Sequence, residues 1–194
     1  MQNRLIIYIP KITPRHQYIF KVLFNELYFI EYSLTDSKEN YLASKEIKLN
    51  YSRNSICIGE IFIESNGLLS EKGINEIDIT VQLINNQSAF FAATDENAYP
   101  FDFLAASFYL ISRYEEYLPH LKDKYNRYKA EESLAFKHGF LEKPIVNIWM
   151  QEFIEKLKQQ FPNLNIQYPK FKYVSTIDID NAYLYRGKGF VRSI

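Results

Sequence analysis

The sequence predicts an α/β protein in which residues 1–168 form a domain with a mixed sheet and flanking helices. Three observations indicate this fold class. Residues 5–34 contain a strand, a helix and a second strand in order, which is the pattern of a βαβ unit. Short runs with the alternation of strands continue to residue 92, and two longer segments with helical spacing follow.

The βαβ unit is defined by its apolar pattern and by two prolines. Leu5–Ile9 is an apolar run that ends before Pro10, which indicates a buried strand. A helix is expected from Pro14, because Thr13 can cap it and proline is favoured at the first helical position. The apolar face of this helix consists of Tyr18, Ile19, Val22, Leu23 and Leu27. The β-forming residues of Tyr28–Leu34 predict the second strand.

Four more strands are expected between residues 46 and 92. Glu46–Tyr51 and Asp78–Ile84 alternate polar and apolar residues, as half-buried strands do. Ile56–Ile63 is apolar apart from Gly59 and Glu60, which suit a turn or a bulge. A further short candidate is Ala89–Ala92.

Two helices are expected in the second half of this domain. Phe103–Tyr117 has apolar residues at helical spacing, with Asp102 as its cap and Pro119 beyond its end. Residues 144–161 begin at a proline and carry a buried stripe at a spacing of three and four residues. That stripe consists of Val146, Trp149, Met150, Phe153, Leu157 and Phe161. The intervening His120–Lys143 is polar and aperiodic, so a long loop with a role of its own is expected.

The composition is that of a globular protein and excludes several classes. Hydrophobic residues make up 47% of the chain, and 23 Lys and Arg balance 23 Asp and Glu. Because nucleic-acid affinity comes mainly from phosphate neutralisation, this balance predicts no nucleic-acid partner. No apolar run reaches the ~18 residues of a membrane span and no signal segment is visible, so a cytoplasmic location is expected. The one cysteine, Cys57, lies in an apolar run and is interpreted as a buried structural thiol rather than a nucleophile.

Phe171–Asp180 has the pattern of an apolar strand that ends in two acids. Because side chains alternate faces along a strand, Asp178 and Asp180 are expected on one side, with Cα atoms ~6.5 Å apart. Two acids on a buried β surface are costly without a cation or hydrogen-bond donors. The pattern therefore indicates a metal or acid–base site, and the alternative is a strand that ends in solvated acids.

The residues around this motif resemble the polysaccharide deacetylases, a carbohydrate esterase family. Thr176–Gly187 is similar to the first motif of that family. Phe101–Tyr117, Ser133–Leu141 and Pro144–Trp149 are similar to the N-terminal domain of its branch from Bacteroidetes-type bacteria. The resemblance covers most of residues 100–190, and Phe101–Tyr117 is its most specific part.

The resemblance implies metal-dependent hydrolysis of an acetyl group on a sugar. In this family a (β/α) barrel holds a divalent ion, commonly zinc, through one Asp and two His, while a second Asp acts as the base. Asp178 matches the base and is therefore the expected catalytic residue. The ligand Asp of the family comes directly next, where this chain has Ile179, so Asp180 is assigned as the metal ligand. The implied partner is an acetylated glycan of cell-surface or capsular type.

The histidine ligands that the family requires are missing. His16, His120 and His138 all precede the motif and lack ligand spacing, so surface or hydrogen-bonding roles are expected for them. Residues 169–194 are expected to be the start of an incomplete catalytic domain that contains the first barrel strand. The chain as given is therefore expected to be inactive and to hold no metal. The divalent ion, zinc by resemblance, is expected only in the full-length protein. The orphaned strand is expected to pair with the N-terminal sheet or with a second copy, which would give a homo-oligomer.

Two other functions stay open. A metal-dependent glycosyltransferase would use the two acids to hold a nucleotide sugar, although no glycine-rich phosphate turn is visible. Alternatively, residues 1–168 are a non-catalytic accessory domain that binds a glycan or a partner. Arg113 and Glu116, which can pair with each other, are interpreted as part of a substrate-facing or interdomain cluster or as a solvated helix end.

Overall fold

Four short strands form a parallel sheet in the order β2-β1-β3-β4. They are β1 (Leu5–Tyr8), β2 (Tyr32–Thr35), β3 (Ile47–Ser52) and β4 (Ile61–Glu64). In the register of this sheet, Leu5 lies opposite both Tyr32 and Ile47, and Leu49 lies opposite Ile61. The structure, a computed structural model, describes residues 4–168 and 170–178, and it confirms the α/β class.

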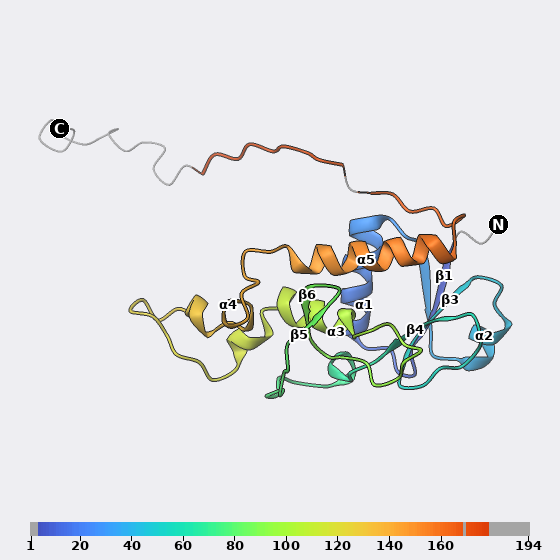
Figure 1. Cartoon of the computed structure of the whole chain (residues 1–194), viewed down its shortest axis with the longest axis horizontal. Coiled ribbons are helices and arrows are strands. Elements are labelled where there is room, and N and C mark those ends of the chain that lie inside the picture. The colour runs from blue at the N-terminus through green and yellow to red at the C-terminus, as the bar shows by residue number, and fades with distance from the viewer. Residues whose placement is uncertain (1–3, 169, 179–194) are drawn as a thin grey trace, which may run out of the picture.

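Helices cover both faces of the sheet. The main core lies on the face covered by α1 (Pro14–Phe20), α3 (Phe103–Ile111) and α5 (Ile145–Gln160). The opposite face carries α2 (Lys38–Ala43), whose Tyr41 packs against side chains of β1. Alternate residues of β1 point to the two cores, as the pleat of a strand requires. Figure 1 shows the sheet at one end of an elongated molecule and α5 running along its length.

The βαβ unit forms as expected up to its second strand. The Thr13 side chain accepts a hydrogen bond from the backbone N–H of His16, and the His16 side chain completes a capping box. The helix continues as a π-helical segment over Lys21–Glu26. Phe29 then has a φ of 52°, which ends the helical backbone. For this reason β2 begins at Tyr32 rather than at the predicted Tyr28.

Residues 53–60 connect β3 to β4, and this link is shorter than the dozen or so residues that usually join parallel strands. Glu60 holds the link in place. Its carboxylate accepts hydrogen bonds from the Tyr41 hydroxyl at 2.8 Å, the Asn50 side chain at 3.0 Å and the Ile56 backbone N–H at 2.6 Å. The predicted strand Ile56–Ile63 is therefore right only in its last part. The thiol of Cys57 is half-buried beside Glu60.

A separate antiparallel hairpin follows, made of β5 (Gln82–Ile84) and β6 (Gln87–Ala89). Its turn residues, Asn85 and Asn86, have φ values of 51° and 61°, which suit a tight hairpin turn. The predicted strand Asp78–Ile84 is confirmed only at its end. Its upstream part forms neither helix nor strand, although Ile79 packs against the core.

The two later helices differ in how well they follow the prediction. Four residues of the predicted α5 stripe, Trp149, Met150, Phe153 and Leu157, are buried as expected, while Val146 and Phe161 are only partly buried. The indole Nε1 of Trp149 donates a 3.0 Å hydrogen bond to the Ser88 carbonyl of β6. Asp102 caps α3 as expected, through the backbone N–H of Ala105 at 2.9 Å. However, α3 ends at Ile111, and a 3₁₀ turn follows over Tyr114–Tyr117. The single helix predicted over Phe103–Tyr117 is therefore wrong in its last part, because Arg113 takes a left-handed φ of 53°.

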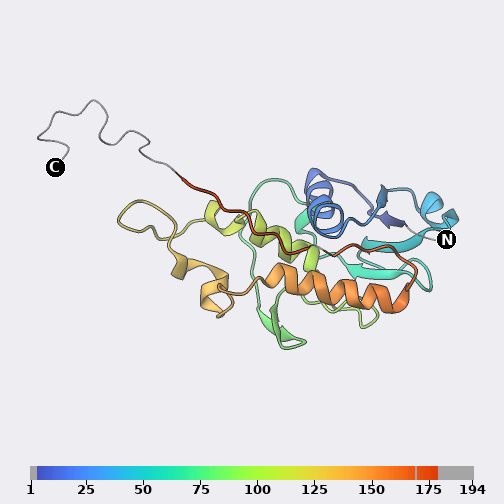
Figure 2. The ribbon, with the colours of Figure 1, turned by 90° about the horizontal axis from the view of Figure 1, so that it is seen from above.

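The polar segment between α3 and α5 forms a projecting arm, defined here as residues 118–133. Figures 1 and 2 both show it at the end of the molecule opposite the sheet. A short helix, α4 (Leu134–Lys137), returns the chain from the arm to α5. The arm is mostly irregular, as the polar sequence predicts, but side-chain hydrogen bonds order it.

The predicted strand at the C-terminal end is wrong for the residues that the structure describes. Residues 170–178 form neither helix nor strand, and Phe171 and Ile177 are 96% and 82% exposed. A strand needs a hydrogen-bonding neighbour, and no described segment pairs with this one. The expected addition of this strand to the N-terminal sheet does not occur. Figures 1 and 2 show the segment running back along the long axis of the molecule.

Candidate functional site

The acidic motif that the sequence singled out is only partly described. Asp178 is exposed and belongs to no helix or strand. Asp180 lies outside the described residues, and so does the prediction that the two carboxylates share a face. Within residues 4–168 and 170–178, no group of His, Cys, Asp and Glu side chains could hold a metal ion. The described residues therefore bring no partner to Asp178.

The three histidines have structural roles in the described part of the chain. His16 is buried and caps α1, and burial lowers its pKa to about 4. The His120 ring lies 2.8 Å from the Leu118 carbonyl oxygen and contacts the Tyr128 ring edge-on. His138 is exposed at the end of α4. These positions agree with the hydrogen-bonding and surface roles that the sequence predicts.

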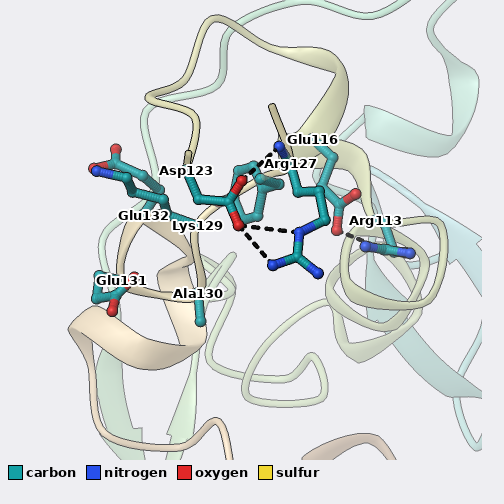
Figure 3. A pocket seen from close by; sticks show the side chains of 9 residues that line it. Arg113, Glu116, Asp123, Arg127, Lys129, Ala130, Glu131 and Glu132 are labelled. Carbon is teal, nitrogen blue, oxygen red and sulfur yellow. Dashed lines mark hydrogen bonds and ion pairs between the residues drawn. The ribbon is translucent and has the colours of Figure 1, made fainter. Parts of the chain in front are cut away.

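A hollow with a volume of about 880 Å³ lies where the arm meets the end of α3. We call it the polar hollow, because charged side chains make up most of its lining. Arg113 and Glu116 line it and form the expected ion pair, with 2.5 Å between Nε and Oε1. Figure 3 shows this pair beside a second pair, Asp123 and Arg127, which the arm contributes. Arg113 and Glu116 thus line a surface hollow, and the Arg113 side chain itself is largely exposed.

The Asp123–Arg127 pair is built by a tight turn in the arm. Asp123 Oδ1 accepts hydrogen bonds from the backbone N–H groups of Tyr125 and Arg127 at 2.8 and 2.9 Å. Its Oδ2 accepts from Nε and Nη2 of Arg127 at 3.0 and 2.8 Å, a two-point contact that fixes the guanidinium. These hydrogen bonds, first those from the Arg127 backbone, lower the pKa of Asp123. The site therefore contains a carboxylate and a guanidinium held in fixed positions.

A second hollow of about 550 Å³ adjoins the first, and the two share Arg113, Glu116 and Tyr128 in their linings. We call it the apolar hollow. Its distinguishing residues come from the end of α3, from α4 and the turn after it, and from the start of α5; they are Leu110, Ile111, Ala135, Phe140, Ile145 and Val146. Both volumes fall in the range of roughly 300–1,000 Å³ that ligand sites in proteins occupy.

Glu115 lines the apolar hollow and joins two of the segments around it. Its carboxylate accepts a 2.9 Å hydrogen bond from the backbone N–H of Leu134, the first residue of α4. Burial raises the pKa of Glu115, and the hydrogen bond from Leu134 partly offsets this rise. The contact joins the segment after α3 to the end of the arm, so the two sides of the site keep their relative positions.

The crevice that usually binds ligands in this type of fold is filled by the protein itself. In a parallel sheet of order 2-1-3-4, that crevice lies at the carboxyl ends of β1 and β3. Here Thr13 Oγ1 donates to the Leu69 carbonyl at 2.6 Å, and Arg15 donates to the carbonyls of Leu68 and Gly73. Residues 67–73 therefore lie against the start of α1 and are held there by Thr13 and Arg15.

The fold and the two hollows define an α/β domain with an open surface site at the end remote from its sheet. Residues 5–162 match the model of a family of unknown function (DUF7033), and the chain belongs to this family. No curated protein and no solved structure matches the chain. In the part of the chain that the structure describes, no helix has the length and apolarity needed to cross a membrane.

Proposed function

We propose that the chain is the N-terminal part of a metal-dependent polysaccharide deacetylase, whose catalytic domain begins at about residue 169. The observation that carries this proposal is the position of the acidic motif. Thr176–Asp180, which resembles the first motif of the deacetylases, lies beyond the family domain of residues 5–162, with only residues 163–175 between them. Asp178 is exposed and is not folded onto that domain, so it is free to become part of another one.

In this proposal the substrate is an acetylated glycan of cell-surface or capsular type, handled by a cytoplasmic protein. Asp178 is the general base and Asp180 is a metal ligand. The described residues do not fit a zinc site by themselves, because catalytic zinc normally has three protein ligands. The proposal therefore assigns metal binding to the longer protein, and the histidine ligands to residues after Ile194.

The test measures acetate release and zinc binding with the 194-residue chain and with the full-length protein. Only the full-length protein is expected to release acetate from an acetylated glycan and to bind zinc tightly. In it, Asp178→Asn should remove most turnover and keep the metal, because the base is lost while the ligands remain. Asp180→Asn should weaken zinc binding instead. Full turnover in the Asp178→Asn protein, or acetate release by residues 1–194 alone, would contradict the proposal.

The proposal also includes self-association through the exposed segment 170–178. Its apolar side chains, among them Phe171 and Ile177, lack cover in the single chain, and unpaired strand-like segments invite association. Light scattering would show a dimer of the 194-residue chain at high concentration. A chain that ends at residue 168 should then be a monomer, and equal masses for the two would refute this role of the segment.

One structural observation supports the glycosyltransferase alternative, and another argues against it. The parallel sheet with its βαβ unit is the architecture that it requires. Against it, residues 67–73 cover the start of α1, which is the place where a nucleotide sugar would put its phosphates. Binding of a nucleoside diphosphate sugar by the full-length protein, without acetate release, would favour this alternative over the deacetylase.

A further inference from the structure

We infer that the polar and apolar hollows together bind a neutral, acetyl-bearing oligosaccharide. The domain of residues 5–162 would then hold the glycan while a separate catalytic centre acts on it. The choice of an acetylated sugar rests on the proposed function. The described side chains support the location of the site, its lack of net charge, and its combination of a polar and an apolar hollow.

The charges around the polar hollow balance. Arg113 pairs with Glu116, Arg127 pairs with Asp123, and Glu132 lies 3.7 Å from the ammonium of Lys137, which is next to the hollow without lining it. The remaining lining charges, those of Lys129 and Glu131, are opposite in sign. A nucleotide, a phosphate or a uronic acid polymer would need an excess of positive charge, which this lining lacks. The site therefore suits a ligand without net charge.

The same side chains still offer hydrogen bonds to a ligand. Arg127 uses Nε and Nη2 on Asp123, and within the described residues its Nη1 donates no hydrogen bond. Arg113 donates to Glu116 through Nε, and its two terminal nitrogens are likewise without a hydrogen bond in the described structure. The hollow thus contains both free donors and carboxylate acceptors, which matches a ligand that carries many hydroxyl groups.

Arg127 is positioned by contacts within the arm before any ligand arrives. The Asp123 carboxylate grips Arg127 at two points, and the Arg127 guanidinium lies 4.8 Å from the centre of the exposed Tyr125 ring. A group that is already ordered loses little conformational entropy on binding, so weak hydrogen bonds to a sugar become more effective. Figure 3 shows both guanidinium groups in the same hollow.

The apolar hollow is the part of the site that would bind the acetyl group. An acetamido or acetoxy substituent places an apolar methyl group next to the polar hydroxyls of the sugar ring. The apolar hollow offers Ile111 and Val146 directly beside the polar one, and the two hollows share Arg113 and Tyr128. A deacetylated amino sugar lacks this methyl group and so loses its contact with Ile111 and Val146, the apolar part of a lining that also contains Glu115 and Glu116.

The experiment titrates the 194-residue chain with a hexamer of N-acetylglucosamine and with the fully deacetylated hexamer. Calorimetry gives the Kd, and nitrogen–proton NMR spectra locate the perturbed amides. We expect the acetylated hexamer to bind more tightly and to perturb residues 110–146. Arg127→Gln and Arg113→Gln should each weaken binding by about tenfold or more, because each removes charge-assisted hydrogen bonds. Val146→Thr should reduce the preference for the acetylated hexamer, because it places a hydroxyl in the apolar hollow.

The matched control is Arg4→Gln. Arg4 is also an ion-paired arginine that lines a surface hollow, but it contacts Glu46 next to the sheet, away from the arm. Its substitution should leave the Kd unchanged. Equal loss in Arg4→Gln, wild-type Kd in both Arg113→Gln and Arg127→Gln, or equal affinity for the two hexamers would each overturn the inference. Thermal unfolding of every variant separates lost binding from lost folding.

Failure of this inference can be told apart from failure of the proposed function. If the full-length protein releases acetate while the Arg127→Gln chain binds the hexamer normally, the deacetylase proposal stands and the site is wrong. If the hexamer binds in the hollows but the full-length protein releases no acetate, the site stands and the deacetylase proposal is wrong.

Discussion

The Tyr51 hydroxyl donates a 2.7 Å hydrogen bond to the carboxylate of Asp102, and both side chains are buried. The same carboxylate accepts hydrogen bonds from the backbone N–H groups of Asn66 at 2.8 Å and Ala105 at 2.9 Å. Asp102 therefore joins β3, the segment after β4 and the start of α3. The sequence predicts the cap of α3, but the link to Tyr51 appears only in the folded structure.

Tyr51→Phe should destabilise the domain. The substitution keeps the ring and removes the donor, so a buried carboxylate loses one of its hydrogen bonds. We expect the free energy of unfolding to fall by about 1–3 kcal/mol, measured by urea titration. Tyr117→Phe is the control, because Tyr117 is 69% exposed and should have almost no effect. Similar stabilities for the two variants would show that the Asp102 hydrogen bond contributes nothing.

Asp102 should also make stability depend on pH. Burial raises its pKa to about 6 from the usual 3.8, although its hydrogen bonds act in the opposite direction. Because the folded-state pKa is the higher one, its contribution to stability is complete below pH 3.8 and is lost as the pH rises through about 6.

The Asp102→Asn variant isolates this contribution. Relative to wild type, its free energy of unfolding should rise by up to about 3 kcal/mol between pH 4 and pH 6 and then level off. The comparison with wild type cancels the opposite trend from His16, whose pKa is lowered by burial in both proteins. Urea titrations at pH 4, 5, 6 and 7 measure the difference, and a constant difference would contradict the raised pKa.

Arg113 is the position where glycine and alanine should differ most clearly. Its φ of 53° is in the left-handed region, which glycine adopts without strain and alanine does not. Both substitutions remove the ion pair with Glu116 equally. Arg113→Gly should therefore be more stable than Arg113→Ala by about 1 kcal/mol, measured by thermal and urea unfolding. The reverse order would mean that the chain leaves the left-handed conformation when the arginine is lost.

Glu60→Gln should make Cys57 more reactive. Burial and the neighbouring Glu60 carboxylate raise the pKa of the Cys57 thiol, so little thiolate is present at neutral pH. Removing the negative charge lowers that pKa and loosens the link between β3 and β4. The rate of reaction with a disulfide reagent at pH 7 should rise several-fold. Glu64→Gln, which alters a carboxylate that contacts Thr94 instead, should leave the rate unchanged.

The parts of the fold that the sequence predicts are those that depend on local contacts. Thr13 and Pro14 start α1 by contacts within one turn, and the stripe around Trp149 specifies which side of α5 is buried. The break at Arg113 has no such local signal. Its left-handed backbone allows Tyr114 to be buried against Tyr109 and Glu115 to reach α4, and these contacts exist only after the chain has folded.

Of the two ion pairs in the candidate site, only one could be predicted from the sequence. The spacing of Arg113 and Glu116 predicts their ion pair, which forms even though the helix breaks between Ile111 and Tyr114. The Asp123–Arg127 pair depends on a turn with Asn126 at a φ of 64°, inside a segment without periodicity. Its position beside Arg113 requires the arm to fold back, and no local sequence pattern predicts that fold. Asp178 lies in an exposed segment that forms neither helix nor strand, so its role as the catalytic base stays a proposal.

The covered crevice has a consequence for how this family can vary. A doubly wound domain usually conserves small residues after β1, because a cofactor must approach the backbone there. Here residues 67–73 of the same chain lie in that place. Relatives should therefore preserve Thr13 and Arg15, whose side chains hold residues 67–73, rather than glycines. Differences in ligand preference among relatives should accumulate in the arm, while the β1–α1 turn stays the same.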